Sequence, residues 1–412
     1  MRVEGVGPRG RPGGLKGALA GWMMRSLPAV FRVLRAVSPV LRIGDTVVVT
    51  RYDDVREVFL NDDAFAVPYA RKLDVIMGGQ PFFLGMRDTS DYRRDTAAMR
   101  TVVRSDDLPA LAAEAGRLAA EAVRAGGGRI EVVNDLVREV TFAVLGRYFG
   151  VSDPPDGDLR IWASRLFEFQ FADPGDDPDL RAEVDAIAPA LRAHIQGLIE
   201  ARRASGAFGD DVLGRCLDRQ SRGDPGFSDG QIRAALTGFV VGGPPQPPMV
   251  VPQALEQLLR RPAELEGARK AALAGDDALL LGYVLEAMRF DPLAPTLPRV
   301  AVRDELIAAG SRRATNVREG ATLLVAFSSA MMDERRVPDP RRFNPRRLAH
   351  EYMHFGHGLH TCFGLQINHA ILPMMLKPLL ERRGLRRAPG PDGHLRKRGA
   401  FAERLEVVYD PE

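Results

Sequence analysis

The sequence predicts a mostly α-helical fold with small peripheral β-sheets, and two observations carry this prediction. Apolar residues recur at helical spacing over most of residues 90–207. Runs rich in β-branched and aromatic residues are short and far apart, at "RVAV" (299–302), "ATLLVAF" (321–327) and "ERLEVVY" (403–409). The loop-like runs between the helical patterns are too short to be linkers, so we expect one large domain over residues 1–412.

The first 40 residues are interpreted as a leader followed by a surface helix. The apolar run "GALAGWMM" (17–24) is shorter than a bilayer requires and is followed by Arg25, so no transmembrane segment is expected. Residues 17–37 are amphipathic enough that contact with a membrane surface remains an alternative. Residues 41–62 then predict a strand pair with a turn at Gly44-Asp45, followed by a short helix.

A buried helix is predicted to start after Ser228, with Gln231 three residues later completing a capping box. The segment that follows, "VGGPPQPPMV" (241–250), contains four prolines. A proline inside a helix removes a backbone donor and costs about 3 kcal/mol. We therefore expect residues 242–248 to leave helical geometry, with the helix resuming at "ALEQLLRR" (254–261).

The composition excludes some classes of function. Acidic and basic residues nearly cancel, at a net charge of +3, and no basic stripe is interleaved with aromatic residues, so nucleic acid is not an expected partner. The two cysteines, Cys216 and Cys362, lie far apart in a chain without a secretory signal. A disulfide framework is therefore not expected, and a reducing cytoplasm fits.

Cys362 lies in a glycine-punctuated loop, "HFGHGLHTCFG", that leads into an apolar helix. The amides at a helix start favour a thiolate, which suits a metal ligand, and the nearby glycines indicate close backbone approach to something flat or bulky. A buried structural cysteine is the simpler interpretation, and it suits Cys216 better. The spacing of His354, His357 and His360 also raises a zinc site, but one cysteine is a poor match for the usual ligand sets.

At this loop the sequence resembles the cytochrome P-450 family. "FGHGLHTCFG" (355–364) is similar to the family's haem-binding loop, whose cysteine thiolate ligates the iron. The resemblance implies the P-450 fold, heme b (iron protoporphyrin IX) as cofactor and Cys362 as the ligand. It also implies that Phe355 packs near the haem, that His360 contacts a propionate, and that Gly356 and Gly364 belong to the binding loop.

Further segments extend this resemblance over nearly the whole chain. "LEAMRF" places Glu286 and Arg289 like the family's Glu-x-x-Arg pair, which is structural and buried. "LPRVA" resembles the segment whose arginine binds a propionate, which implies that role for Arg299. "DPRRFNPRR" (339–347) resembles the meander before the haem loop.

One departure concerns the third long helix of the family. Bacterial relatives carry a histidine and, four residues later, an arginine that faces the propionates, whereas this chain has Tyr92 and Thr96. Tyr92 could donate a hydrogen bond to the haem, but Thr96 has no charge. Arg93, Arg94 or Arg100 remain open as substitutes.

The second departure is the proline segment. By the resemblance, Gly242 and Gly243 are the small residues where the central helix passes over the haem, Pro245 stands at the usual acid and Gln246 at the usual threonine. Proline has no side-chain donor, and an amide is not a proton donor at neutral pH. The ordinary relay for oxygen activation is therefore missing, unless the prolines merely kink a helix beside an otherwise ordinary site.

These observations predict a haem-thiolate oxidoreductase acting on a largely apolar small molecule, natural-product or lipid-like, as in secondary metabolism. Three functions stay open: monooxygenation with electrons from a ferredoxin and its reductase, peroxygenation or hydroperoxide rearrangement without external electrons, and a non-catalytic haem-binding or recruiting role. Gln246 is the candidate catalytic residue. Candidate substrate contacts, each of which could equally be core packing, are Gly242, Pro245, Leu293, Ala294, Phe169 and the loop 68–86.

Overall fold

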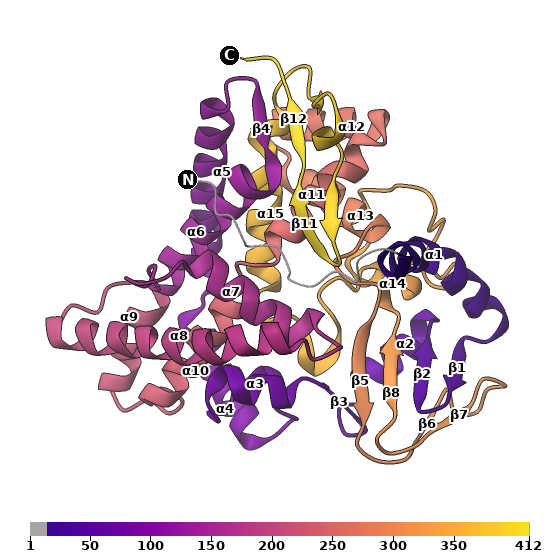
Figure 1. Ribbon diagram of the computed structural model, residues 1–412, viewed down its shortest axis with the longest axis horizontal. Helices are drawn as coiled ribbons and strands as arrows, with labels where there is room; N and C mark the ends of the chain where they lie inside the picture. Colours follow the sequence, from indigo (N-terminus) through magenta and orange to yellow (C-terminus); the bar gives the residue numbers. More distant parts are fainter. Residues whose placement is uncertain (1–14, 412) are drawn as a thin grey trace. The chain divides into compact units, whose positions relative to one another are not determined.

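The computed structural model describes residues 15–411 of the chain, and side chains from Ser26 onward (Figure 1). The first fourteen residues of the predicted leader, and the side chains of the apolar run 17–24, therefore lie outside the described residues. The described chain forms two compact units. We call Tyr69–Val284 with residues 366–411 the helical unit, and residues 15–68 with Leu285–Leu365 the sheet unit. The expectation of a single domain stays a prediction.

The helical unit carries most of the helices. They are α3 (Ala70–Met77), α4 (Ser90–Val102), α5 (Leu108–Ala125), α6 (Glu139–Phe149), α7 (Leu159–Phe167), α8 (Pro178–Ser205), α9 (Val212–Ser221), α10 (Asp229–Gly242), α11 (Pro247–Leu259), α12 (Pro262–Ala274), and most of α13 (Asp277–Phe290) and α15 (Leu365–Leu380). Two π-helical segments, Val132–Arg138 and Glu168–Ala172, precede α6 and follow α7.

Helix α10 packs against α6, α7 and α8 of the helical unit (Figure 1). It starts as predicted, because the Ser228 side chain accepts from the backbone of Gln231 and the Gln231 side chain accepts from the backbone of Ser228. Its residues from Ala234 to Val241 are all buried. Cys216, on the neighbouring α9, is fully buried, and burial raises the pKa of its thiol to about 12. The structural interpretation of Cys216 is confirmed.

Small sheets complete the helical unit. β4 (Arg129–Glu131), β12 (Glu406–Val408) and β9 (Arg386–Arg387) form an antiparallel sheet with β12 in the middle. β10 (Arg396–Arg398) and β11 (Phe401–Arg404) form a hairpin. The predicted strand at 403–409 is thus two strands in different sheets, because the chain leaves one sheet and enters the other at Leu405.

The sheet unit is built on five strands in the order β1-β2-β8-β5-β3. These are β1 (Val40–Ile43), β2 (Thr46–Val49), β3 (Phe65–Ala66), β5 (Leu297–Ala301) and β8 (Thr322–Val325), joined by α1 (Leu15–Val37), α2 (Tyr52–Leu60), α14 (Phe327–Ala330) and the hairpin of β6 (Glu305–Ile307) and β7 (Thr315–Val317). Strands β2 and β8 run parallel, whereas the other pairs are antiparallel. The predicted turn is confirmed, with Gly44 at φ +59°.

An ion pair on α13 anchors the loops of the sheet unit. Glu286 and Arg289 are 0% and 1% exposed and form two parallel bonds, with Arg289 Nη2 donating to Oε1 at 2.6 Å and Nε to Oε2 at 2.8 Å. Burial would raise the pKa of Glu286, but the hydrogen bonds and charge of Arg289 hold it below its ordinary value. The low exposure of both side chains confirms the prediction of a buried pair. The two parallel hydrogen bonds offset part of the cost of removing these charges from water.

The same carboxylate gathers the segment that precedes the cysteine loop. Glu286 Oε1 also accepts from the Asn344 amide at 2.9 Å and from Arg347 Nε at 3.0 Å. Arg347 in turn donates to Glu351 Oε2 at 2.8 Å and to the carbonyl of Pro338 at 2.7 Å. The "DPRRFNPRR" segment is therefore pinned to α13 by charged hydrogen bonds rather than by regular secondary structure.

We predict that Arg289→Ala lowers the free energy of unfolding by about 3–5 kcal/mol, because it leaves the buried Glu286 charge without its main partner. Urea unfolding, or the yield of folded protein where the variant does not accumulate, measures this loss. Arg336→Ala is the control in the same unit, since Arg336 and Asp53 form an exposed pair and should cost less than about 1 kcal/mol. Equal losses in the two variants would contradict the prediction.

A second buried charge cluster lies where α7 runs into its π-helical extension. The Arg165 side chain is 3% exposed and lies between two carboxylates, with Nη1 3.1 Å from Glu168 Oε2 and Nε 3.1 Å from Glu183 Oε2. Burial raises the pKa of Glu168 to about 7, against the opposing effect of Arg165. The folded protein therefore binds a proton at Glu168 over a pH range in which the unfolded chain has lost it.

This shift predicts how stability depends on pH. The raised pKa means that Glu168 makes folding progressively less favourable as pH rises from about 4.5 to about 7, with a slope of at most about 1.4 kcal/mol per pH unit. Glu168→Gln should remove this dependence, so that its stability relative to the parent rises over that range and is constant above it. Urea unfolding between pH 5 and 8 is the measurement, with the exposed Glu121→Gln as the matched control. A parallel pH profile for parent and Glu168→Gln would contradict the assignment.

Candidate functional site

The cysteine loop of the sheet unit has a closed backbone geometry. The amide of Cys362 donates to the carbonyl of Phe355 at 2.8 Å, and the amide of Leu365 donates to the carbonyl of Cys362 at 3.2 Å, where α15 starts. Gly356 and Gly358 have φ of +75° and +74°, a region that favours glycine. The Cys362 side chain is thereby held at the junction of loop and helix.

One of these glycines is needed for packing within the protein. A Cβ on Gly358 would lie 2.4 Å from the backbone oxygen of Phe59, on α2. The close backbone approach that the glycines predict is therefore, at Gly358, an approach to α2. Around Gly356 the nearest atom is the His360 carbonyl oxygen at 3.3 Å, which belongs to the loop itself.

The Cys362 thiol is partly buried. Burial raises the pKa of the thiol, while a hydrogen bond from the Gly364 amide acts in the opposite direction. Desolvation therefore outweighs the amide in the protein alone, and the expectation that Cys362 is a thiolate ligand stays a prediction. A positively charged partner at the sulfur would reverse this balance.

Two basic side chains lie close together beside this loop. Arg299, on β5, is 4% exposed, and its guanidinium lies 5.0 Å from the centre of the Phe59 ring. The His360 side chain is 5% exposed, and burial together with the charge of Arg299 lowers its pKa to about 4. Asp62 lies 3.8 Å from His360 Nε2. Phe59 was not anticipated, because nothing in the sequence of α2 marks one apolar residue as the support of an arginine.

These residues fit a haem group. The Cys362 sulfur receives an amide hydrogen bond, and the half-buried Phe355 lies at the start of the same loop. The charge of the buried Arg299 makes protonation of the buried His360 costly. A metal ion at the sulfur and carboxylates at the basic pair would relieve both costs. The residues present therefore match iron protoporphyrin, which carries a metal and two propionates.

The three histidines of the loop have separate partners. His354 Nε2 is 2.9 Å from the carbonyl of Leu285, and His357 Nε2 accepts from Arg56 Nε at 3.2 Å. His360 lies beside Arg299 and Asp62. Within residues 15–411, no cluster of three or more His, Cys, Asp or Glu side chains could hold a metal ion.

In the helical unit, the proline segment breaks the central helix over a shorter stretch than expected. α10 ends at Gly242 and α11 begins at Pro247, so only residues 243–246 lie outside the two helices. The expected restart at residue 254 is wrong. Pro247 and Pro248 occupy the first turn of α11, where backbone amides have no partner within the helix and proline is tolerated. Pro244 and Pro245 cause the break, because they remove the amides that would continue the ladder from α10.

Gln246 closes this break. Its side-chain Nε2 donates to the carbonyl of Gly242, the last residue of α10, and its backbone amide donates to the carbonyl of Gly243 at 3.3 Å. A Cβ on Gly242 would have no atom within 4 Å, whereas one on Gly243 would lie 2.8 Å from the carbonyl of Phe239. Gly242 is thus next to open space, which fits close approach of a flat group, while Gly243 is required by the helix end.

Helix α4 carries Arg93 and Arg94, two of the possible substitutes for the arginine that Thr96 replaces. Arg93 forms two 2.7 Å bonds to Asp88, and Arg94 bonds to Asp91 and Asp95. These two arginines are engaged by neighbouring carboxylates. Tyr92 is partly buried and lies in the first turn of α4. Its backbone amide donates a hydrogen bond to the side chain of the N-cap residue Thr89.

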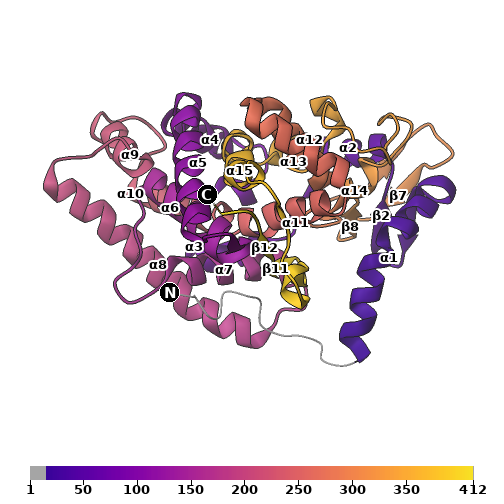
Figure 2. The same cartoon turned by 90° about the horizontal axis from the view of Figure 1, so that it is seen from above.

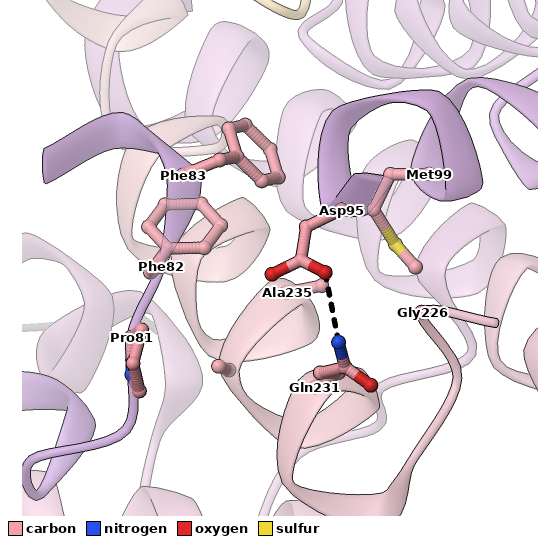
Figure 3. Close-up of a pocket in the computed structure, with 9 residues that line it drawn as sticks. Pro81, Phe82, Phe83, Asp95, Met99, Gly226, Gln231 and Ala235 are labelled. Carbon is pink, nitrogen blue, oxygen red and sulfur yellow. Dashed lines mark hydrogen bonds between the residues drawn. The ribbon is translucent and has the colours of Figure 1, made fainter. Parts of the chain in front are cut away.

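A small cavity of about 10 Å³ lies beside Asp95 (Figure 3). It is lined by Pro81, Phe82, Phe83, Asp95, Met99, Gly226, Gln231, Ala234 and Ala235. Gln231 Nε2 donates to Asp95 Oδ1 at 2.8 Å. The volume holds about one water molecule, so this cavity is not a substrate site. A Cβ on Gly238 would lie 2.3 Å from the ring of Phe82, which therefore packs onto α10, as Phe83 does beside Phe239.

The other pocket candidates are held by local contacts. Leu293 and Ala294 are half-buried in the sheet unit, in a loop fixed by Ser328, whose hydroxyl donates to the carbonyl of Pro295 at 2.8 Å. Phe169 is 3% exposed in the helical unit, with Lys72 Nζ 4.8 Å from its ring centre. The role of Phe169 in a substrate pocket stays a prediction.

The predicted residues divide between the two units. The sheet unit contains Cys362, His360, Arg299, Phe355, Gly356, Gly364, Leu293, Ala294, Glu286 and Arg289, and the helical unit contains Tyr92, Gly242, Gly243, Pro245, Gln246 and Phe169. The structure brings together the cysteine loop with Arg299, and separately the glycine–proline segment with Gln246.

Comparison with known proteins identifies relatives of this arrangement. The family model "Cytochrome P450" matches residues 278–392, which include Glu286, Arg289, Arg299 and Cys362. The bifunctional dioxygenase–epoxy alcohol synthase of Pyricularia oryzae is 40% identical over 123 residues, which is 29% of this chain and 10% of that protein. The monooxygenase PikC of Streptomyces venezuelae is 25% identical over 362 residues, covering 85% of this chain and 82% of PikC. Cytochrome P450 107B1 of Saccharopolyspora erythraea is 28% identical, and the match spans 61% of its length.

Solved structures show the same fold over almost the full chain. The structure of P450BioI in complex with an acyl carrier protein ligated to hexadec-9Z-enoic acid has a TM-score of 0.81, with 95% of this chain and 100% of that chain covered at 18% identity. The mostly helical fold with small sheets is therefore confirmed as the cytochrome P450 fold. This chain therefore has the cytochrome P450 fold, and its segment 278–392, which contains the Glu286–Arg289 pair, the strand with Arg299 and the cysteine loop, matches the cytochrome P450 family model.

Proposed function

We propose that this protein is a haem-thiolate oxidoreductase that binds heme b and oxidises a largely apolar small molecule. The observation that carries the proposal is the closed cysteine loop with the buried Arg299–His360 pair beside it. The bound haem would supply the oxidation chemistry at its iron. Cys362 is the iron ligand, and Arg299 and His360 bind propionates, with Tyr92 as a further propionate donor.

The chain's own groups set the state of the ligand. The Gly364 amide donates to the Cys362 sulfur and stabilises its negative charge, while burial excludes water from it. Phe355 would pack beside the bound cofactor. These are roles of binding, orientation and water exclusion, which is what a protein contributes to a cofactor enzyme.

Relatives support an apolar substrate and monooxygenation. PikC is a monooxygenase, CymV of Salinispora arenicola is a cyclomarin C epoxidase, and a relative from Mycobacterium tuberculosis is a steroid C26-monooxygenase. We therefore propose electrons from a ferredoxin and its reductase, and a free or carrier-bound natural-product or lipid-like substrate. A cytoplasmic location fits the two free cysteines.

A second candidate is rearrangement of a hydroperoxide without external electrons. The segment 243–246 offers no acid or hydroxyl side chain, and the amide of Gln246 is bonded to the carbonyl of Gly242. An unsaturated hydroperoxide that becomes an epoxy alcohol keeps both oxygen atoms: the O–O bond breaks, one oxygen bridges the double bond and the other remains as the hydroxyl. No reductant or external proton is consumed, which suits a site without a proton relay. The dioxygenase–epoxy alcohol synthase relative supports this candidate by its name.

The ligand assignment predicts the spectrum of the reduced carbon monoxide complex. The parent protein should show the red-shifted band of a thiolate ligand, and Cys362→Ala should abolish it, because no other group in the loop supplies an anionic sulfur. Cys216→Ala is the matched control and should keep the band. A thiolate band that survives Cys362→Ala, or an ordinary histidine-type band in folded parent protein, would overturn the assignment.

Gln246 is expected to matter for turnover in both proposed reactions. Under either reaction, Gln246→Ala should lower turnover about tenfold or more at unchanged haem content, since it frees the carbonyl of Gly242 and removes a donor near the open space. Gln196→Ala, on the surface of α8, is the control. Unchanged turnover in Gln246→Ala would remove this residue from the site.

Product assays decide between the two candidates. Purified protein is supplied with a ferredoxin system, with an unsaturated fatty-acid hydroperoxide alone, or with neither. Monooxygenation predicts turnover only with reductant, and tighter coupling of electrons to product when Pro245→Glu and Gln246→Thr are introduced together. Hydroperoxide rearrangement predicts turnover without reductant, and loss of the epoxy alcohol in the same double variant.

A further inference from the structure

Helix α1 presents an apolar stripe that the rest of the sheet unit does not cover. Val30, Val33 and Val37 are 46%, 57% and 79% exposed, and Ala29 and Ala36 are exposed on the same side. These positions follow helical spacing, so they form one face. Single exposed apolar residues are common on protein surfaces, whereas a contiguous exposed apolar face usually marks an interaction surface.

The opposite side of α1 fixes it to its unit. Phe31 is 5% exposed, and Arg35 Nη1 donates to the hydroxyl of Ser329 on α14 at 2.7 Å. The carboxyl end of α1 therefore lies against α14, and Figure 2 shows the amino-terminal half of the helix projecting beyond the strands of the same unit. The stripe is thus presented by an anchored helix rather than by a loose end.

The sequence continues the same pattern toward the start of α1. Leu15, Ala18, Leu19 and Trp22 fall on the helical positions that line up with Val30 and Val33. Tryptophan at such a position is typical of the boundary between a membrane and water. In the sequence, apolar residues therefore continue at helical spacing to the start of α1.

The charge around this helix has one sign. Residues 5–44 contain seven basic residues and no acidic one, whereas the whole chain has a net charge of +3. The basic residues are Arg9, Arg11, Lys16, Arg25, Arg32, Arg35 and Arg42. An apolar stripe flanked by basic residues, with no balancing acid, is the pattern of a helix that lies in the plane of an anionic membrane surface.

We propose that α1 and its basic flanks bind the surface of an anionic lipid membrane, with the Val30–Val33–Val37 stripe at the level of the lipid headgroups. Charge decides against a second copy of the chain as the occupant, because two such faces would bring like charges together. Among the residues that the structure describes, no helix is long and apolar enough to cross a bilayer. We therefore propose that α1 lies on the membrane surface and does not span the bilayer. It is independent of the proposed reaction, since these residues are outside the haem site.

Sedimentation with vesicles tests the proposal on full-length, haem-loaded protein. One set of vesicles is pure phosphatidylcholine, and the other contains phosphatidylglycerol at about one third. We expect at least tenfold stronger binding to the anionic vesicles, weakened by added salt because exposed charges are screened. Val33→Asp combined with Val37→Asp should lower that binding at least tenfold while leaving the carbon monoxide spectrum unchanged.

The control is Leu348→Asp, which changes a residue of the same unit that is 61% exposed but lies off α1. It should bind vesicles like the parent. Equal binding of parent and the α1 variant would overturn the proposal, as would equal binding to neutral and anionic vesicles. Dimerisation in solution that the α1 variant abolishes, without vesicle binding by the parent, would also overturn it and assign the stripe to a second copy.

Discussion

The paired contact between Glu286 and Arg289 is the interaction on which the sheet unit depends. Both groups have left water, and the loss of hydration is offset because the carboxylate also receives the Asn344 amide and Arg347. The segment bound in this way has little regular structure and leads directly into the cysteine loop. The position of Cys362 therefore rests on charged hydrogen bonds that begin on α13, rather than on a helix or strand of its own.

The cysteine loop is electrostatically costly in the protein alone. Burial raises the pKa of the thiol, and burial with a neighbouring guanidinium lowers the pKa of His360, so each group is held in its less polar form. Under the proposed function, iron at the sulfur and two propionates at the basic pair would offset these costs together. Burying these groups lowers the stability of the protein alone, and a bound ligand compensates for it. Such perturbed groups are common at functional sites.

Proline acts in two opposite ways between α10 and α11. Pro244 and Pro245 end the ladder of α10 because they lack the amides that would continue it, whereas Pro247 and Pro248 start α11 because its first turn needs none. Gln246 lies between them and bonds to the carbonyl that the break exposes. Residues 243–246 therefore contain no acid or hydroxyl side chain that could relay a proton. Of the two proposed reactions, hydroperoxide rearrangement needs no such relay.

The sequence by itself determined the features that are local in the chain. The capping box at Ser228, the Gly44 turn, the helix class and the Glu286–Arg289 pair depend on residues within a few positions of one another, and family motifs added Arg299 and the cysteine loop. Only the tertiary structure decided the features that depend on distant neighbours. Burial of the Cys362 side chain raises the pKa of its thiol, against the effect of the Gly364 amide. Phe59 supports Arg299 and requires a glycine at position 358, and Phe82 and Phe83 pack onto α10. The physical reason is that burial and close packing are set by whatever lies across space, which periodicity and spacing along one chain do not encode.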